Sequence, residues 1–171
     1  MKHKLAVIFG VLVLQSLLMA APVSANQPLR GPLDTHFNLG FGDLATPCPH
    51  ITWAGNVELN GDEYGLAWTP LALPKAVGQS FHVEERWMIY ESPLAFEGEA
   101  VFTECDAPVV MWGDEEAIES LPNLHAVGNG QVDWVDPDGP FDEALLGRNT
   151  HWSGVISDDL LHTPGTFRIN R

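Results

Sequence analysis

The chain has 171 residues, and its 23 acidic residues outnumber the eight lysines and arginines, which makes the formal net charge −15 at pH 7. A field of that sign repels phosphate groups and anionic lipid, and therefore disfavours binding to nucleic acid and electrostatic docking on a membrane. We expect neither kind of partner for the mature chain.

The first 25 residues have the pattern of a cleavable secretory signal peptide. Lys2 and Lys4 make the start basic, residues 5–21 are largely apolar, and the small side chains of residues 23–25 suit a signal peptidase that cuts after Ala25. The alternative is an uncleaved membrane anchor, for which the apolar run is short. The pattern predicts a secreted or otherwise extracytoplasmic bacterial protein, which after cleavage has six basic residues against 23 acidic ones.

Residues 26–49 are rich in proline, glycine and asparagine and show no steady period, so we interpret them as an extended N-terminal arm. A single domain is expected from residue 50 to residue 171. Its clearest local feature is a hairpin, in which residues 51–59 alternate between apolar and polar and Asn60-Gly61 suits a type I′ turn. The returning strand is expected to point Tyr64, Leu66 and Trp68 inward.

Alternation, turn residues and glycine positions predict the remaining elements of this domain. Between Gly113 and Pro122 the alternation stops, and Asp114 is suited to cap a short helix. The sequence predicts an all-β, mainly antiparallel fold: an eight-stranded barrel or a barrel-like sandwich with one short helix. Glycines within the strands favour the barrel, because closure needs sharp bends. Further strands are expected at residues 79–91, 96–103, 108–112, 124–135, 145–156 and 166–169.

Seven segments of the chain carry a resemblance to other proteins: Trp53–Val57, Gly61–Gly65, Glu84–Tyr90, Gly128–Val132, Gly139–Phe141, Gly147–Gly154 and Pro164–Asn170. They resemble segments of a group of exported bacterial β-barrel-like domains with no assigned activity. Glycine-punctuated strands followed by Gly139-Pro140-Phe141 are also similar, more distantly, to the allene oxide cyclase and dirigent barrels. The resemblance implies a barrel and export, and it assigns no catalytic residue.

Cys48 and Cys105 are the two cysteines of the chain. In an oxidising compartment we expect them to form a disulfide. A cysteine nucleophile or a thiolate metal ligand would need a reduced thiol, which such a compartment disfavours.

Glu85 is the most informative polar residue, because the alternation of its strand places it on the apolar face. A buried carboxyl group must be paired or protonated. Arg148 or Arg168 is a possible partner, and His151 lies close to Arg148 in sequence. If Glu85, Arg148 and His151 converge in a pocket, they can serve as an acid–base group or a polar anchor; the alternatives are a bulge that turns Glu85 outward or a structural ion pair.

Two groups of side chains have residue types that bind metal ions. Asp136, Asp138 and Asp142 crowd one turn and are weak calcium candidates, although a solvated acidic turn explains them as well. His82 and Glu84 share a strand face and offer two ligands without a visible third. No motif for a cofactor is present, and we expect none.

The sequence therefore favours a secreted barrel that binds a small apolar ligand or a partner protein, without catalysis. One alternative is an isomerase or cyclase of the barrel type that uses an interior carboxylate. The other is a structural or surface-interaction module, which a barrel filled by the six tryptophans would favour.

Overall fold

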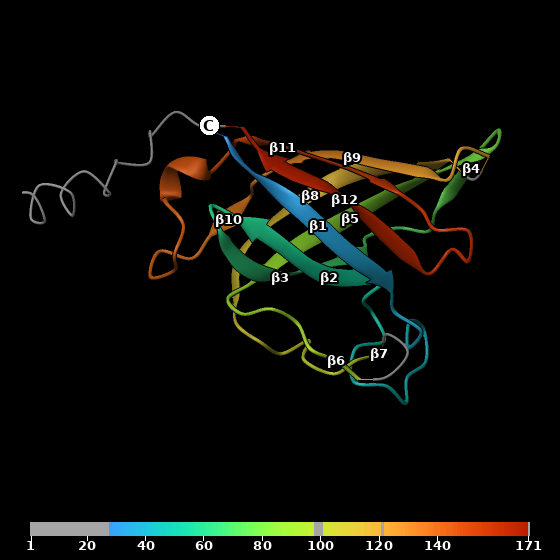
Figure 1. The fold of residues 1–171 in the computed structure, drawn as a ribbon, viewed down its shortest axis with the longest axis horizontal. Helices are drawn as coiled ribbons and strands as arrows, with labels where there is room; N and C mark the ends of the chain where they lie inside the picture. Colours follow the sequence, from blue (N-terminus) through green and yellow to red (C-terminus); the bar gives the residue numbers. More distant parts are fainter. Residues whose placement is uncertain (1–27, 98–100, 121, 171) are drawn as a thin grey trace, which may run out of the picture.

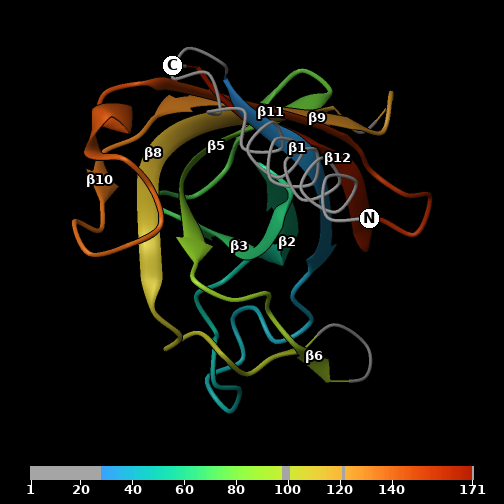
Figure 2. The same cartoon turned by 60° about the vertical axis from the view of Figure 1, so that its left-hand side comes forward.

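A computed structural model describes residues 28–97, 101–120 and 122–170; the expected signal peptide lies outside these residues. Antiparallel strands curl around one axis into a closed barrel (Figures 1 and 2). In the order in which they pair, its eight strands are β8 (Val109–Ser120), β9 (His125–Gln131), β11 (Asn149–Val155), β12 (His162–Ile169), β1 (Leu29–Phe37), β2 (Trp53–Leu59), β3 (Asp62–Pro70) and β5 (Ser80–Tyr90). The pairing of β5 with β8 closes the ring, which confirms the predicted all-β barrel.

Two short strands extend the barrel at its margins. Strand β4 (Lys75–Val77) pairs with the beginning of β5, and β10 (Trp134–Val135) pairs with β8. The described part of the chain has one short helix, the 3₁₀ turn η1 (Glu143–Leu145), capped by the Asp142 side chain. No helix among the described residues has the length and apolar character needed to cross a membrane.

The predicted hairpin is confirmed as β2 and β3. Asn60 and Gly61 have φ angles of 58° and 91°, the two positive values that a type I′ turn requires. The turn sets the register, so Tyr64, Leu66 and Trp68 all point into the barrel core.

The expectation of an N-terminal arm over residues 26–49 is wrong for its first half. Residues 29–37 form β1, which lies between β12 and β2 in the barrel wall. Leu29, Leu33 and Thr35 are buried, so the strand contributes to the core despite its Gly31-Pro32 pair. The hydrogen-bond partners of β1 are β12 and β2. Neither forms a short hairpin with β1, so no local turn signal indicated this strand.

The helix expected between Gly113 and Pro122 is also not observed, because these residues continue β8. The inward positions of this half of β8 are Gly113, Glu115, Ala117 and Glu119, where glycine, alanine and two glutamates replace large apolar side chains. Because polar and small residues occupy these inward positions, the sequence shows no apolar alternation here, and the strand was not predicted.

A cap of loops lies over the outer face of β2, β3 and β5 (Figure 1). The predicted disulfide between Cys48 and Cys105 joins two of its segments, with 5.6 Å between the Cα atoms. The strand expected at residues 96–103 is here a pair of two-residue strands, β6 (Phe96–Glu97) and β7 (Val101–Phe102). Under the cap, Ile51, Tyr90 and Leu94 form a second, smaller apolar cluster.

Candidate functional site

Three carboxyl groups point into one end of the barrel. Strand β5 alternates around Val83, Glu85 and Trp87, which are all buried, so the predicted inward direction of Glu85 is confirmed. Strand β8 contributes Glu115 and Glu119. Glu85 and Glu115 are only 4% and 7% exposed and are paired residues in the β5–β8 register.

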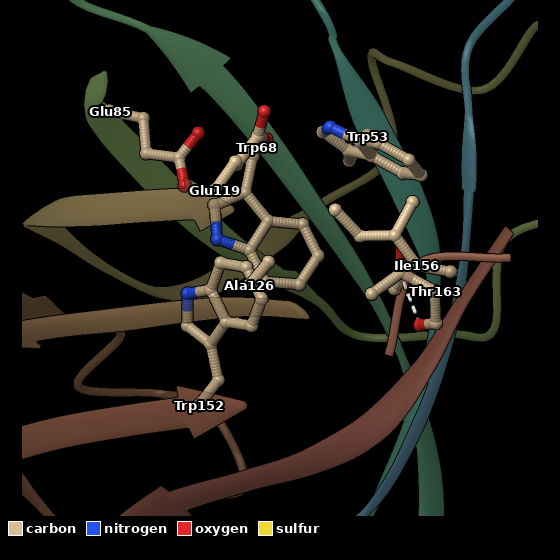
Figure 3. Close-up of a pocket in the computed structure, with 9 residues that line it drawn as sticks. Trp53, Trp68, Glu85, Glu119, Ala126, Trp152, Ile156 and Thr163 are labelled. Atoms are coloured by element: carbon tan, nitrogen blue, oxygen red, sulfur yellow. Dashed lines mark hydrogen bonds between the residues drawn. The ribbon is translucent and has the colours of Figure 1, made fainter. Parts of the chain in front are cut away.

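Two indole groups bind the carboxylate of Glu115. Nε1 of Trp68 donates to Oε1 of Glu115 at 2.7 Å, and Nε1 of Trp152 donates to the same oxygen at 2.5 Å. The two rings pack together with centroids 5.5 Å apart, and Figure 3 shows their nitrogens turned to the same side. The other oxygen, Oε2, is buried and accepts no hydrogen bond from an N–H group of the described residues.

Burial decides the protonation of these acids. Desolvation, followed by the charge of Glu115, raises the pKa of Glu85 well above its ordinary value. Burial likewise raises the pKa of Glu115 to about 7, against the hydrogen bonds from Trp152 and Trp68, which favour its charged form. Glu85 therefore holds the proton of this pair and donates it toward Glu115, whose charged form the indole hydrogen bonds favour. Burial also raises the pKa of Glu119, although a hydrogen bond from Trp53 opposes this shift.

Two of these carboxyl groups, those of Glu85 and Glu119, border a narrow pocket with three tryptophans in its wall (Figure 3). Its free space is about 10 Å³, close to the minimum for one water molecule. Trp53 and Glu119 are partly exposed and lie where the pocket opens. The lining contains no lysine, arginine or histidine, and consists of Thr35, Trp53, Trp68, Glu85, Glu119, Ala126, Trp152, Ile156 and Thr163.

The structure does not bring Arg148 and His151 to Glu85. Strand β11 points Thr150 and Trp152 inward, so His151 faces outward and contacts Asn129 at 2.9 Å. Arg148 is exposed just before β11, and its Nε donates to the carbonyl of Ala144 at 3.2 Å. Arg168 is also exposed, because its neighbours Phe167 and Ile169 take the inward positions of β12.

The acidic turn is not gathered into a metal site. Oδ1 of Asp136 accepts from the backbone N–H of Asp138, and Oδ1 of Asp142 caps η1 through the N–H of Ala144. These contacts are those of ordinary Asx turns and caps. His82 and Glu84 also diverge, because His82 contacts Glu116 at 3.0 Å whereas Glu84 pairs with Lys75.

Sequence reasoning missed Glu115, Glu119 and the tryptophan donors as members of the site. The available signal was the two-residue spacing of Met111, Gly113, Glu115 and Ala117, which continues the alternation of a strand if a glutamate is accepted at an inward position. The resulting pocket combines acidic and aromatic groups, so its chemistry suits a proton, a cation or a hydrogen-bond donor.

Comparison with protein-family models, with curated proteins and with solved structures finds no match.

Proposed function

We propose that this domain is an exported binding protein for a small organic amine, whose ammonium group occupies the interior pocket. The observation that carries the proposal is that Glu85 and Glu119 line a pocket whose lining has no basic side chain, with Glu115 bound to two of the lining tryptophans. Buried charge needs a partner, and a ligand cation supplies one.

The aromatic wall supports the same ligand chemistry. Indole faces attract ammonium groups through their quadrupole, by about 0.5–2 kcal/mol. Trp68, Trp152 and Trp53 surround the pocket, and the first two turn their N–H groups to Glu115, which orients the rings. Carboxylate and indole together favour a cation over a neutral alcohol of the same shape.

The size of the pocket limits which part of the ligand enters. Space for about one water accommodates an ammonium nitrogen, whereas drug-sized ligands occupy pockets of about 300–1,000 Å³. The carbon chain of the amine would therefore lie at the opening, against Trp53 and beside Glu119. A larger apolar ligand inside the barrel would require the tryptophans to move.

The test is a binding titration of the full mature chain with n-butylammonium, 1-butanol and n-butyrate, followed by calorimetry and ligand-detected NMR. We expect binding of the amine alone. The amine stays charged up to about pH 9, while protons compete for the carboxyl groups, so its affinity should rise between pH 5 and pH 8 by at most about tenfold per pH unit for each proton released.

The amine affinities of two variants test whether the ligand binds in this pocket. Glu119→Gln should weaken amine binding by about tenfold or more, because a charged hydrogen-bond partner is lost. Glu84→Gln, a change at an exposed neighbour of Glu85, is the matched control and should leave binding unchanged. Equal binding of the amine and the alcohol, or no binding at millimolar amine, would overturn the proposal and leave the interior acids as structural groups in a surface-interaction module.

A further inference from the structure

A second group of polar side chains lies on the outer face of the barrel, where β1 pairs with β12. Asp34 and His36 are two residues apart on β1 and face outward together, because Leu33 and Thr35 take the inward positions. His162, the first residue of β12, is the paired residue of His36 in the register. The potential ligand atoms of Asp34, His36 and His162 all lie within 4.8 Å of one another.

These side chains are in direct contact. Nε2 of His162 contacts Oδ1 of Asp34, and the rings of His36 and His162 stack with centroids 4.5 Å apart and planes 16° apart. All three side chains reach solvent, so a metal ion has access to them. Within the described residues, no other group of three or more histidine, cysteine, aspartate or glutamate side chains converges in this way.

We propose that Asp34, His36 and His162 form a binding site for a divalent transition metal ion, with Zn²⁺ as the preferred ion. Two imidazole nitrogens and one carboxylate are a common ligand set for zinc, and they leave a fourth position for water or a ligand. In a tetrahedral zinc site the ligand atoms are about 3.4 Å apart, given Zn–N bonds of about 2.1 Å. The three side chains would rotate from their present separation to reach that geometry, and all of them are accessible to solvent.

The loop before β12 supports the site from outside. Oδ1 of Asp159 accepts hydrogen bonds from the Ser157 hydroxyl and from the backbone N–H of Leu161, and Ser157 Oγ accepts from the N–H of His162. The charge of Asp159 acts on both histidines and would help to neutralise a bound cation.

The competing explanation is an aspartate–histidine ion pair without a metal, and the chain contains a matched example. His82 contacts Glu116 at 3.0 Å on the outer face of β5 and β8, and no second histidine belongs to that pair. A variant at His82 therefore removes a histidine–carboxylate pair without touching the proposed site.

The experiment is a zinc competition titration against a chromophoric chelator, on the full mature chain without a histidine tag, with the stoichiometry measured after dialysis. We expect one Zn²⁺ per chain. His36→Gln and His162→Gln should each weaken binding by at least about 100-fold and Asp34→Asn by about tenfold, because metal affinity depends on both the ligands and the groups that orient them. His82→Gln should bind zinc as the unaltered chain does.

A spectroscopic readout covers the case in which a variant folds poorly. In the unaltered chain, Co²⁺ should give the intense visible bands of a four-coordinate site, and Zn²⁺ should shift the imidazole NMR signals of His36 and His162 selectively. Absence of bound zinc, a shift of other histidines, or equal losses in the His82 and His162 variants would overturn the proposal.

Discussion

Glu85 and Glu115 are paired residues of β5 and β8, so their two carboxyl groups point side by side into the same end of the barrel. The pair is stabilised by a proton on Glu85 and by two indole N–H groups on Glu115. This arrangement makes stability, and not only ligand binding, depend on pH.

Replacement of Glu85 by glutamine should make the fold less sensitive to pH. The folded chain holds the Glu85 proton to well above the ordinary pKa of glutamate, whereas the unfolded chain releases it near 4.5. Above pH 4.5 the unfolded state thus binds fewer protons, so stability falls as pH rises, by at most about 1.4 kcal/mol per pH unit for one proton. Glu85→Gln has no such proton to lose. Between pH 5 and pH 8, its free energy of unfolding should therefore fall less than that of the unaltered chain.

The measurement is the free energy of unfolding in urea at several pH values between 5 and 8. Glu84→Gln serves as the control, because this neighbour is exposed and pairs with Lys75 at the surface. A pH dependence in Glu85→Gln as steep as that of the unaltered chain would contradict the raised pKa of Glu85.

Replacement of Trp152 by phenylalanine should destabilise the barrel by about 2–3 kcal/mol, because Glu115 loses a hydrogen bond to its charged form. The loss should be larger at pH 8 than at pH 5, since the pKa of Glu115 is about 7. Trp112→Phe, at an outer tryptophan that packs on Arg86, is the control and should show no such pH dependence. Urea unfolding at the two pH values measures both effects.

Gly128 should tolerate no larger residue. A Cβ atom at this position would lie 2.0 Å from Nε1 of Trp152, the donor to Glu115. We expect Gly128→Ala to destabilise the fold by about 1–3 kcal/mol through overpacking, as measured by thermal unfolding. Ser153→Ala, which changes an outward side chain of β11, is the comparison; a similar loss in both variants would contradict the close approach.

The disulfide should stabilise the cap more than the barrel. In the chain-entropy model, loss of the Cys48–Cys105 link costs about 4 kcal/mol for a loop of this length. In the Cys48→Ser/Cys105→Ser variant, hydrogen exchange should increase around Ile51, Leu94 and Phe102, which pack beneath the cap. Strands β9 and β11, on the opposite side of the ring, should keep their protection; uniform loss of protection would show that the cap and the barrel unfold together.

Much of this fold was predictable wherever the chain carries its own local signal. Alternation in β5 placed Glu85 inward, and the Asn60-Gly61 turn set the register of β2 with β3. Such signals are absent where polar residues, glycine or proline occupy strand positions. Inward Glu115 made half of β8 resemble a helix start, and Gly31-Pro32 hid a strand of the barrel wall.

The sequence by itself determined the all-β class and the face on which Glu85 lies, because periodicity and turn chemistry act over a few neighbouring residues. It also determined the pairing of the cysteines, because the chain has only two of them. Only the tertiary structure decided which side chains meet. The register of β5 with β8 placed Glu115 beside Glu85, and that of β1 with β12 placed His162 beside His36. Alternation specifies a direction for each side chain, whereas its neighbours across the sheet depend on the pairing of strands that are distant in the chain.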